Sequence, residues 1–229
     1  MPIYLVELLA SFLAVIIIIT LHEFAHAFVA YKCGDPTAKF CGRMTLNPAK
    51  HFDPLGIVMF ALVGFGWAKP VPVNPNNFND YKKGSFFTAS AGIAVNYLTA
   101  FLFYPLAVLT LVYITPRFSG TYMEYFLEMF VRCLFTYSLS FCVFNLLPFF
   151  PLDGFRIVDA LSERRGKVYR FLRQYGYYIL LGLMLLSILA DRIPYLGYVD
   201  VLGYVMRFAV DIFGKPITAC WKPLLRAIL

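Results

Sequence analysis

Long apolar runs constrain this chain more than any other feature of its sequence. The first run extends from Ile3 to Tyr31 and exceeds the roughly 18 residues that mark a membrane-spanning helix. Hydrophobic residues make up 60% of the chain and charged residues only 14%, whereas soluble domains carry about 25% charged residues. We therefore predict an all-α polytopic membrane protein with about five transmembrane helices, at residues 3–31, 86–115, 122–147, 175–190 and 199–213.

The first run lacks the features of a cleaved signal peptide. No basic residue precedes it, Glu7 lies near its start, and no small-residue cleavage site follows it. We expect the run to remain in the mature protein, and we treat residues 1–229 as a single transmembrane domain.

A short element is predicted between the first two helices. The run from Leu55 to Trp67 contains three glycines and is too short to span a bilayer. The next segment, Ala68 to Pro75, holds three prolines, which exclude a helix interior and predict an extended strand. The polar residues 37–54 alternate in a way that favours a short hairpin. We therefore expect a re-entrant or β-hairpin element on the cytoplasmic side.

The distribution of lysine and arginine predicts an orientation. If the first helix ends in the cytoplasm and residues 55–67 do not cross, sixteen of the 20 basic residues lie in cytoplasmic segments, and Arg117 and Arg192 lie opposite. The tail from Gly214, with its three basic residues, is expected at the interface on the cytoplasmic side. This asymmetry indicates a multi-pass protein of the cell membrane whose basic loops stay inside. The net charge of +7 therefore does not indicate nucleic-acid binding.

One motif places three ionisable side chains inside the first apolar run. His22 and His26 are four residues apart, so both imidazoles project from one helix face and can bind one metal ion. Ionisable groups within an apolar helix are costly and are generally functional. Glu23 lies beside the first imidazole, where it can take a proton from water. We expect Zn²⁺, because imidazole suits this ion and catalytic zinc sites keep one position open for water.

Two histidines leave one protein ligand of a catalytic zinc site unassigned. His51 lies in a polar loop, and Asp153 follows the third predicted helix in the segment NLLPFFPLDG, residues 145–154. Asp153 is also typical of an ordinary turn or helix cap, since Asp-Gly after proline is common turn chemistry. The residue pattern by itself leaves these alternatives open.

Taken together, HEFAH and NxxPxxPLDG resemble the paired motifs of the site-2 protease family of intramembrane zinc metalloproteases. NPAKHFDPLG, GWAKPVPVNP and AGIAVN also resemble the compact branch of that family, which lacks PDZ and CBS domains. The similarity covers about residues 15–160. It implies a catalytic core at about 1–160, with accessory helices at about 161–229. It further implies that His22, His26 and Asp153 ligate zinc and that Glu23 is the general base.

The resemblance also implies roles for two asparagines. Asn96 and Asn145 are expected to lie near the metal and to hold substrate or an oxyanion. One departure from the family pattern is visible, because the family often has Gly-Pro where this chain has Gly92-Ile93. Two buried asparagines are also typical of hydrogen bonds between membrane helices, so this alternative stays open for Asn96.

The expected activity is cleavage of transmembrane segments within the bilayer. Single-pass membrane proteins or peptides are the expected substrates, with the lipid bilayer and a regulatory membrane protein as further partners. A substrate helix must unwind before attack, because its carbonyls are held in its own hydrogen bonds. Trp67 and Val71 are candidate substrate contacts, since the extended segment around them can pair with an unwound chain as an added strand. The alternative is a loop that only packs against the first helix.

Three other functions fit the sequence less well. A protease acting on soluble chains needs a sizeable polar catalytic domain, and no segment is long enough to form one. A metal transporter predicts acidic or histidine residues along several helices, whereas here they gather at two places. An inactive scaffold is disfavoured because Glu23 is present.

Overall fold

Helices make up nearly all the regular structure of this protein. The computed structural model describes residues 3–63, 66–162 and 165–228, and no strand occurs within these three ranges. In chain order the elements are α1 (Ile3–Lys32), α2 (Thr37–Phe40), η1 (Pro48–Lys50), α3 (Pro54–Val63), η2 (Pro75–Asn77), α4 (Tyr81–Leu109), η3 (Thr110–Ile114), η4 (Thr115–Phe118), α5 (Tyr122–Leu146), α6 (Asp153–Leu161), α7 (Lys167–Ala190), η5 (Pro194–Val199) and α8 (Val201–Ile228).

Four helices are long and apolar enough to cross a membrane. They are α1, α4 with its continuation to Phe118, α5 and α7. The fifth predicted helix, residues 199–213, belongs to the 28-residue α8, which is not among these candidates. Arg207, Asp211 and Lys215 all lie in the first part of α8, and their charge makes it a poor spanning helix. The prediction of five spanning helices is therefore corrected to four candidates.

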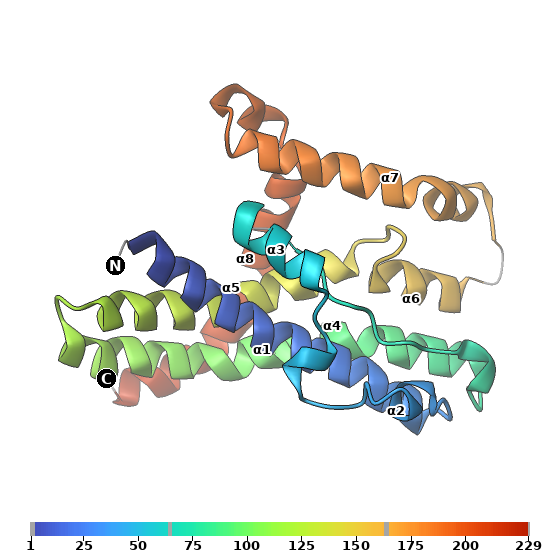
Figure 1. The fold of residues 1–229 in the computed structure, drawn as a ribbon, viewed down its shortest axis with the longest axis horizontal. Helices are drawn as coiled ribbons and strands as arrows, with labels where there is room; N and C mark the ends of the chain where they lie inside the picture. Colours follow the sequence, from blue (N-terminus) through green and yellow to red (C-terminus); the bar gives the residue numbers. More distant parts are fainter. Residues whose placement is uncertain (1–2, 64–65, 163–164, 229) are drawn as a thin grey trace.

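Helices α1, α4 and α5 pack against one another and form the centre of the molecule (Figure 1). Four alanines of α1 are fully buried, namely Ala10, Ala14, Ala27 and Ala30, and Ala14 packs against Cys133 and Leu134 of α5. Small side chains let helix backbones approach closely, which matters in a bilayer because no hydrophobic driving force holds helices together there. This packing brings the HExxH face of α1 against α4 and the end of α5.

Helix α7 lies apart from this three-helix bundle. In Figure 1 it runs along the upper edge, and α8 leads from its far end back to α4 and α5. Few of its side chains are buried, among them Tyr169 and Leu180. Helix α7 therefore forms a separate wall, facing the bundle across a cavity described below.

The predicted hairpin over residues 37–54 is not present in the structure. This segment contains α2 and η1, and the described part of the chain holds one isolated antiparallel bridge, between Phe52 and Ala68. The Asn47 side chain accepts a hydrogen bond from the Ala49 N–H. Local capping of this kind, with proline at the next position, favours a helical turn over a strand.

The predicted short element does contain a helix too short to span. Helix α3 has ten residues, which cover about 15 Å, or half the thickness of the hydrocarbon core. The chain from Trp67 to Asn74 then runs without helix, as the prolines predict, but the predicted strand is not formed, and the described residues show only the isolated bridge at Ala68. The Lys69 N–H donates to the His51 carbonyl at 2.9 Å, which ties this extended segment to the preceding loop.

The tail from Gly214 is the second half of α8 rather than an interfacial segment beside the end of α1. The Trp221 indole donates to the Phe101 carbonyl at 2.9 Å, and the Tyr113 hydroxyl donates to the Ile228 carbonyl at 2.9 Å. This half of α8 therefore follows α4 towards its C-terminal end, and it carries the tail's basic residues with it.

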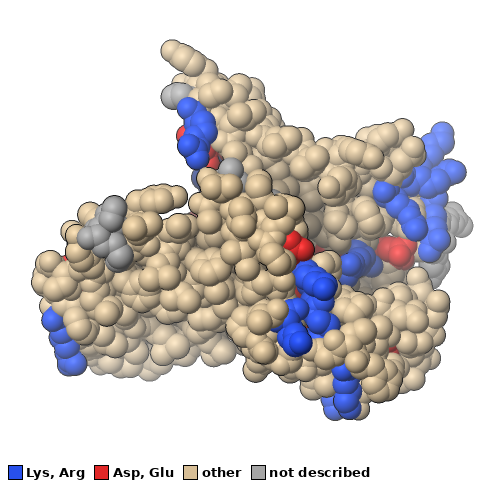
Figure 2. All heavy atoms as spheres, viewed as in Figure 1, with Lys and Arg blue, Asp and Glu red and all other residues tan. Residues whose placement is uncertain are grey.

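Most other basic residues lie at one end of the spans, which we call the site end. Helix α1 ends there, α4 begins there, α5 ends there and α7 begins there. Figure 2 shows Lys and Arg mainly in the right half of the view, around the start of α7 and beside α2, with uncharged residues across most of the middle. A positive end of this kind is typical of the cytoplasmic side, and the orientation stays a prediction.

Candidate active site

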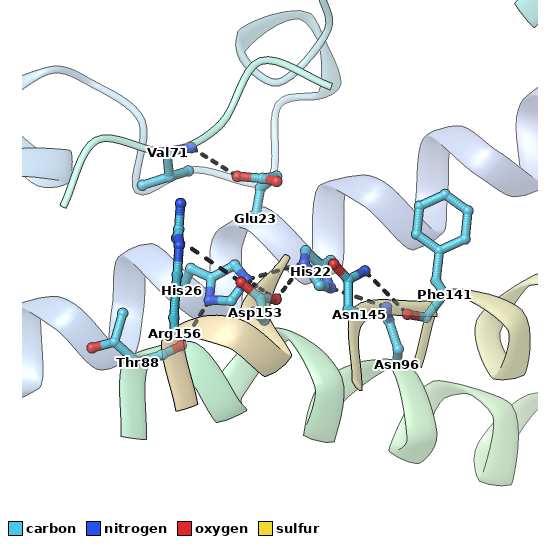
Figure 3. Close-up of polar contacts among 10 residues, drawn as sticks. All are labelled: His22, Glu23, His26, Val71, Thr88, Asn96, Phe141, Asn145, Asp153 and Arg156. Atoms are coloured by element: carbon cyan, nitrogen blue, oxygen red, sulfur yellow. Dashed lines mark hydrogen bonds and ion pairs between the residues drawn. The ribbon is translucent and has the colours of Figure 1, made fainter. Parts of the chain in front are cut away.

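Three metal-ligating side chains from two helices meet at one point. The Nε2 atoms of His22 and His26 lie 3.0 Å apart. Asp153 Oδ2 lies 3.3 Å from His22 Nε2 and 3.0 Å from His26 Nε2. All three residues are buried, and Figure 3 shows them directed toward one another from α1 and α6. The fold thus unites two motifs that are far apart in the sequence.

The spacing of these donor atoms fits a tetrahedral zinc ion. Zinc–ligand bonds of about 2.0–2.2 Å at tetrahedral angles place neighbouring ligand atoms roughly 3.3 Å apart. The observed separations of 3.0 and 3.3 Å are close to that value. Two imidazoles and one carboxylate also leave a fourth position for water or substrate, as in catalytic zinc sites.

The alternative ligand, His51, lies elsewhere. It is fully buried, and its Nε2 atom lies 2.7 Å from the Thr45 carbonyl oxygen. Among the described residues, the one group of His, Cys, Asp or Glu side chains that converges on a point is the set His22, His26 and Asp153. The geometry therefore favours Asp153 as the third ligand over His51.

The start of α6 positions Asp153. Asp153 is the first residue of α6, directly before Gly154, and a Cβ on this glycine would lie 2.4 Å from the Leu146 carbonyl oxygen at the end of α5. Only glycine allows so close a contact. Burial alone would raise the pKa of the Asp153 carboxyl, but its ion pairs and hydrogen bonds with His26 and His22 hold that pKa well below the usual range.

We expect Gly154→Ala to move Asp153 and to weaken metal binding. The added methyl group must displace α6 from the end of α5, at an overpacking cost of about 1–3 kcal/mol. Zinc retention by the purified variant, together with its thermal unfolding, measures the effect. Gly182→Ala on α7 is the matched control, because a Cβ there meets nothing within 4 Å and should stabilise the helix by about 0.5–1 kcal/mol. Equal zinc retention by wild type and Gly154→Ala would contradict this reading.

The second nitrogen of each imidazole faces α4. His26 Nδ1 lies 2.7 Å from the Thr88 carbonyl oxygen, and His22 Nδ1 lies 3.0 Å from the side-chain amide of Asn96. Between them, a Cβ on Gly92 would come within 2.4 Å of both rings. Helix α4 therefore forms the floor beneath the two histidines.

Glu23 is held by the extended segment that follows α3. Its Oε2 atom accepts a hydrogen bond of 2.8 Å from the Val71 N–H, and Figure 3 shows the carboxylate directed towards that segment. Glu23 and Val71 are both buried. One carboxylate oxygen is thus fixed by a backbone donor, which orients the group beside the histidines.

Asp35 anchors the far end of the same segment. Its carboxylate accepts hydrogen bonds from the Asn74 N–H at 2.7 Å and from the Asn77 amide at 2.8 Å. Burial by itself would raise the pKa of Asp35, but the hydrogen bonds from Thr37, Asn77 and Asn74 outweigh it and lower the pKa below its ordinary value. The loop after α1 therefore fixes where Val71 meets Glu23.

A cavity of about 800 Å³ opens beside the three donors. Its charged lining residues are Glu23, Asp153 and Arg156, and most of the others are apolar. Two walls have helical spacing: α1 contributes Phe12, Val15, Ile19, His22, Glu23 and His26, and α7 contributes Tyr177, Leu180, Leu181, Met184, Ser187 and Ile188. The site therefore faces an apolar space between α1 and α7.

The four residues predicted to contact substrate or an oxyanion divide into two groups. Trp67, Val71 and Asn145 line the cavity. Asn145 also donates to the Phe141 carbonyl at 3.0 Å within α5. Asn96 is fully buried and is absent from the lining. Three of these residues therefore lie at the cavity, and the fourth, Asn96, contacts the His22 imidazole instead.

Sequence reasoning missed three features of the site: the Thr88 carbonyl, Gly92 and Arg156. Residues 88, 92 and 96 are spaced by one helical turn and share one face of α4. Because Asn96 was predicted to lie near the metal, this spacing could have identified Thr88 and Gly92 as its neighbours at the site. Arg156 was counted only among the basic residues of the predicted cytoplasmic segments. Its guanidinium lies 3.9 Å from Asp153 Oδ1, one turn along α6.

The fold and the site together define a zinc metallopeptidase built into membrane helices. Sequence comparison agrees: the profile described as Peptidase family M50 matches residues 10–187. The chain belongs to this family, which comprises zinc metalloproteases of the site-2 protease type.

Two relatives support this assignment. The chain is 36% identical over 230 residues to "Putative zinc metalloprotease YwhC" of Bacillus subtilis (strain 168), covering 98% of this chain and 95% of the relative. It is 29% identical over 175 residues to "Putative zinc metalloprotease Rip2" of Mycolicibacterium smegmatis (strain ATCC 700084 / mc(2)155), covering 72% of this chain and 62% of that relative. No solved structure matches the chain.

Proposed function

We propose that this protein cleaves transmembrane segments of membrane proteins inside the bilayer. The observation that carries the proposal is the position of the site: His22, Glu23 and His26 lie within a candidate spanning helix and face an apolar cavity. His26 lies six residues before the end of α1, or about 9 Å along the helix axis. A site at this depth is suited to substrates that arrive within the membrane.

The proposed chemistry divides between the metal and Glu23. His22, His26 and Asp153 would hold zinc, which supplies Lewis acidity that polarises a carbonyl oxygen and acidifies water. Glu23 takes the proton from the attacking water on its carboxylate oxygen and delivers it to the nitrogen of the leaving amine. The Val71 N–H holds Glu23 Oε2 at 2.8 Å, so the second oxygen of the carboxylate carries the proton.

Two helix faces flank the cavity, and a third helix could bind between them. The lining residues of α1 and α7 recur at spacings of three and four, which is typical of two helix faces that flank a third helix. A single-pass substrate would enter between these walls and then unwind, because a regular helix keeps its carbonyls in its own hydrogen bonds.

The extended segment beside Glu23 is suited to accept an unwound substrate, but only through its carbonyls. The N–H groups of Lys69 and Val71 are already donated to His51 and Glu23, and Pro70 and Pro72 have none. From residue 69 to residue 72, the segment therefore has no N–H left for a partner. In this proposal the substrate strand supplies the donors and the segment supplies the acceptors.

Replacing Val71 by proline should lower kcat/KM by about 10- to 100-fold, because a hydrogen bond to a charged group contributes about 1.5–3 kcal/mol. The substitution removes the N–H that orients Glu23 and suits a segment that is already extended between two prolines. Cleavage of a transmembrane substrate in detergent measures the change. Val71→Ala keeps the N–H and is the control, so equal losses in both variants would contradict the role given to this hydrogen bond.

The substrate class is tested by the position of the cut. Candidate single-pass proteins are co-expressed with this protein in cells, and the new terminus is mapped by mass spectrometry. A terminus inside the transmembrane segment supports the proposal, whereas termini confined to soluble loops contradict it.

The proposal also places the site end towards the cytoplasm, because the basic residues gather there. Single cysteines at positions 39 and 117, labelled from either side of sealed vesicles, test this orientation. Labelling of position 117 from the cytoplasmic side would overturn it.

A further inference from the structure

One face of α4 contacts the rear of both metal-binding imidazoles. The Thr88 carbonyl, Gly92 and Asn96 succeed one another at intervals of one helical turn. The carbonyl and the amide each lie within 3.0 Å of an Nδ1 atom, and Gly92 leaves room for both rings. This face therefore controls how each ring is turned and where its proton lies.

The tautomer of His26 follows from its partner. A carbonyl oxygen can only accept a hydrogen bond, so the contact of 2.7 Å with Thr88 requires the proton on His26 Nδ1. The lone pair of Nε2 then faces Asp153 and His22, where a metal ligand needs it. No side chain is needed to fix this ring, because the backbone of α4 supplies the acceptor.

The tautomer of His22 depends on Asn96 instead. With the amide nitrogen of Asn96 donating to Nδ1, the proton of His22 would lie on Nε2, which then could not ligate. In that orientation the Oδ1 atom of Asn96 is also buried with no hydrogen-bond partner. A half turn of the amide exchanges two atoms of nearly equal size and places Oδ1 against His22 Nδ1.

We propose that Asn96 is a positioning residue whose side-chain oxygen accepts a hydrogen bond from His22 Nδ1–H. It keeps Nε2 of His22 free for zinc, as the Thr88 carbonyl does for His26. Asn96 is fully buried and does not line the cavity, so it acts through the imidazole rather than on the substrate. This inference rests on the proposed zinc site. It makes Asn96 a hydrogen-bond acceptor, whereas contact with a substrate oxyanion would need Asn96 to donate.

Gly92 is required for the same arrangement. A Cβ at this position would lie 2.4 Å from His22 Cε1 and 2.4 Å from His26 Nε2. Any larger residue must push the two rings away from α4, and therefore away from both acceptors. The glycine and the asparagine thus work together, since one provides the close approach and the other uses it.

Two substitutions at position 96 separate an acceptor role from a donor role. Asn96→Leu has a similar shape and no hydrogen-bonding atom, so zinc affinity should fall by about 10- to 100-fold, as is typical when an outer partner of a ligating histidine is lost. Asn96→Asp keeps an acceptor oxygen and removes the N–H donors. It should therefore retain far more zinc affinity than the leucine variant.

The measurement is zinc affinity of the full-length chain by competition with a chelator, with every variant carrying Glu23→Gln so that proteolysis plays no part. Thr99→Val is the matched control, because Thr99 is a buried polar residue on the same helix, whereas within the described structure the histidines bond to α4 through Thr88 and Asn96. Thermal unfolding in the presence of chelator checks that each variant folds.

The outcomes are distinct. Weak binding by Asn96→Leu with rescue by Asn96→Asp supports the inference. Equal affinity in Asn96→Leu and the Thr99→Val control overturns it, and so does a loss in Asn96→Asp as large as in Asn96→Leu. If the parent chain binds no zinc at all, the proposed metalloprotease function itself fails, and this inference fails with it.

Discussion

Glu23→Gln should lower proteolysis by about 10²- to 10⁴-fold, the usual contribution of a general base, while zinc remains bound at about one ion per chain. Glutamine has nearly the same shape and still accepts the hydrogen bond from Val71 N–H, but it cannot take a proton from water. The side chain is not among the three converging donors, so the metal should stay. Parallel assays of substrate cleavage and of metal content on the same purified sample measure both effects.

Glu7→Gln is the control for this experiment. Glu7 lies on the same helix, is exposed, and is not among the residues that line the cavity. Its substitution should change neither quantity. Full cleavage activity in Glu23→Gln would exclude Glu23 as the base, and loss of zinc in that variant would indicate that Glu23 is a ligand after all.

Asp153→Asn should release the metal. The carboxylate is the single negatively charged donor in the set, and its Oδ2 atom lies within 3.3 Å of both imidazole nitrogens. An amide in its place is neutral and is a weak zinc ligand. Zinc affinity should therefore fall by more than the roughly 10- to 100-fold that loss of an outer partner costs, and proteolysis should fall with it. Metal analysis and chelator competition measure zinc content and zinc affinity, and a cleavage assay measures proteolysis.

Asp159→Asn is the matched control, because Asp159 lies on the same helix and two partners of its carboxylate in the described part of the chain lie away from the metal site. Its carboxylate accepts a hydrogen bond from the Tyr169 hydroxyl and lies 3.6 Å from an Arg165 guanidinium nitrogen. If Asp159→Asn retained zinc and Asp153→Asn retained it equally well, the third ligand would have to be sought elsewhere.

The helix boundaries show which helix ends can be predicted from local sequence and which cannot. The end of α1 was predicted at Tyr31, and the structure ends the helix at Lys32. The start of α4 was predicted at residue 86, but the helix begins at Tyr81, because Asp80 caps it by accepting from the Lys83 N–H. An apolar window does not detect a polar first turn. The same reason explains why α7 begins at Lys167 rather than at residue 175.

The prediction for α8 failed for a different reason. The tail from Gly214 was predicted to be an interfacial segment because of its basic residues, yet it continues α8, and Pro216 and Pro223 both lie within this helix. Contacts with α4, such as Trp221 with Phe101, hold this half of the helix in place. Tertiary packing here outweighs a local preference against helix, which no window of sequence can detect.

The candidate site divides in the same way. The pairing of His22 with His26 follows from helical spacing, so it was readable from five consecutive residues. The choice between Asp153 and His51 as third ligand could not be made from the sequence, because either side chain is a suitable zinc ligand. The partner of Glu23 and the role of Asn96 were equally hidden, since each depends on a segment that approaches from elsewhere in the chain.

By itself, the sequence determined the membrane setting, the helical class, the histidine pair with its adjacent glutamate, and the resemblance that implied an aspartate ligand. These properties depend on hydrophobic content and on spacings within one helix, both of which are local. The tertiary structure alone decided that Asp153 reaches the histidines, that Val71 holds Glu23, and that Asn96 contacts His22 rather than the cavity. Each of these contacts joins residues distant in sequence, and only the packing of α1 with α4, α6 and the extended segment brings them within bonding distance.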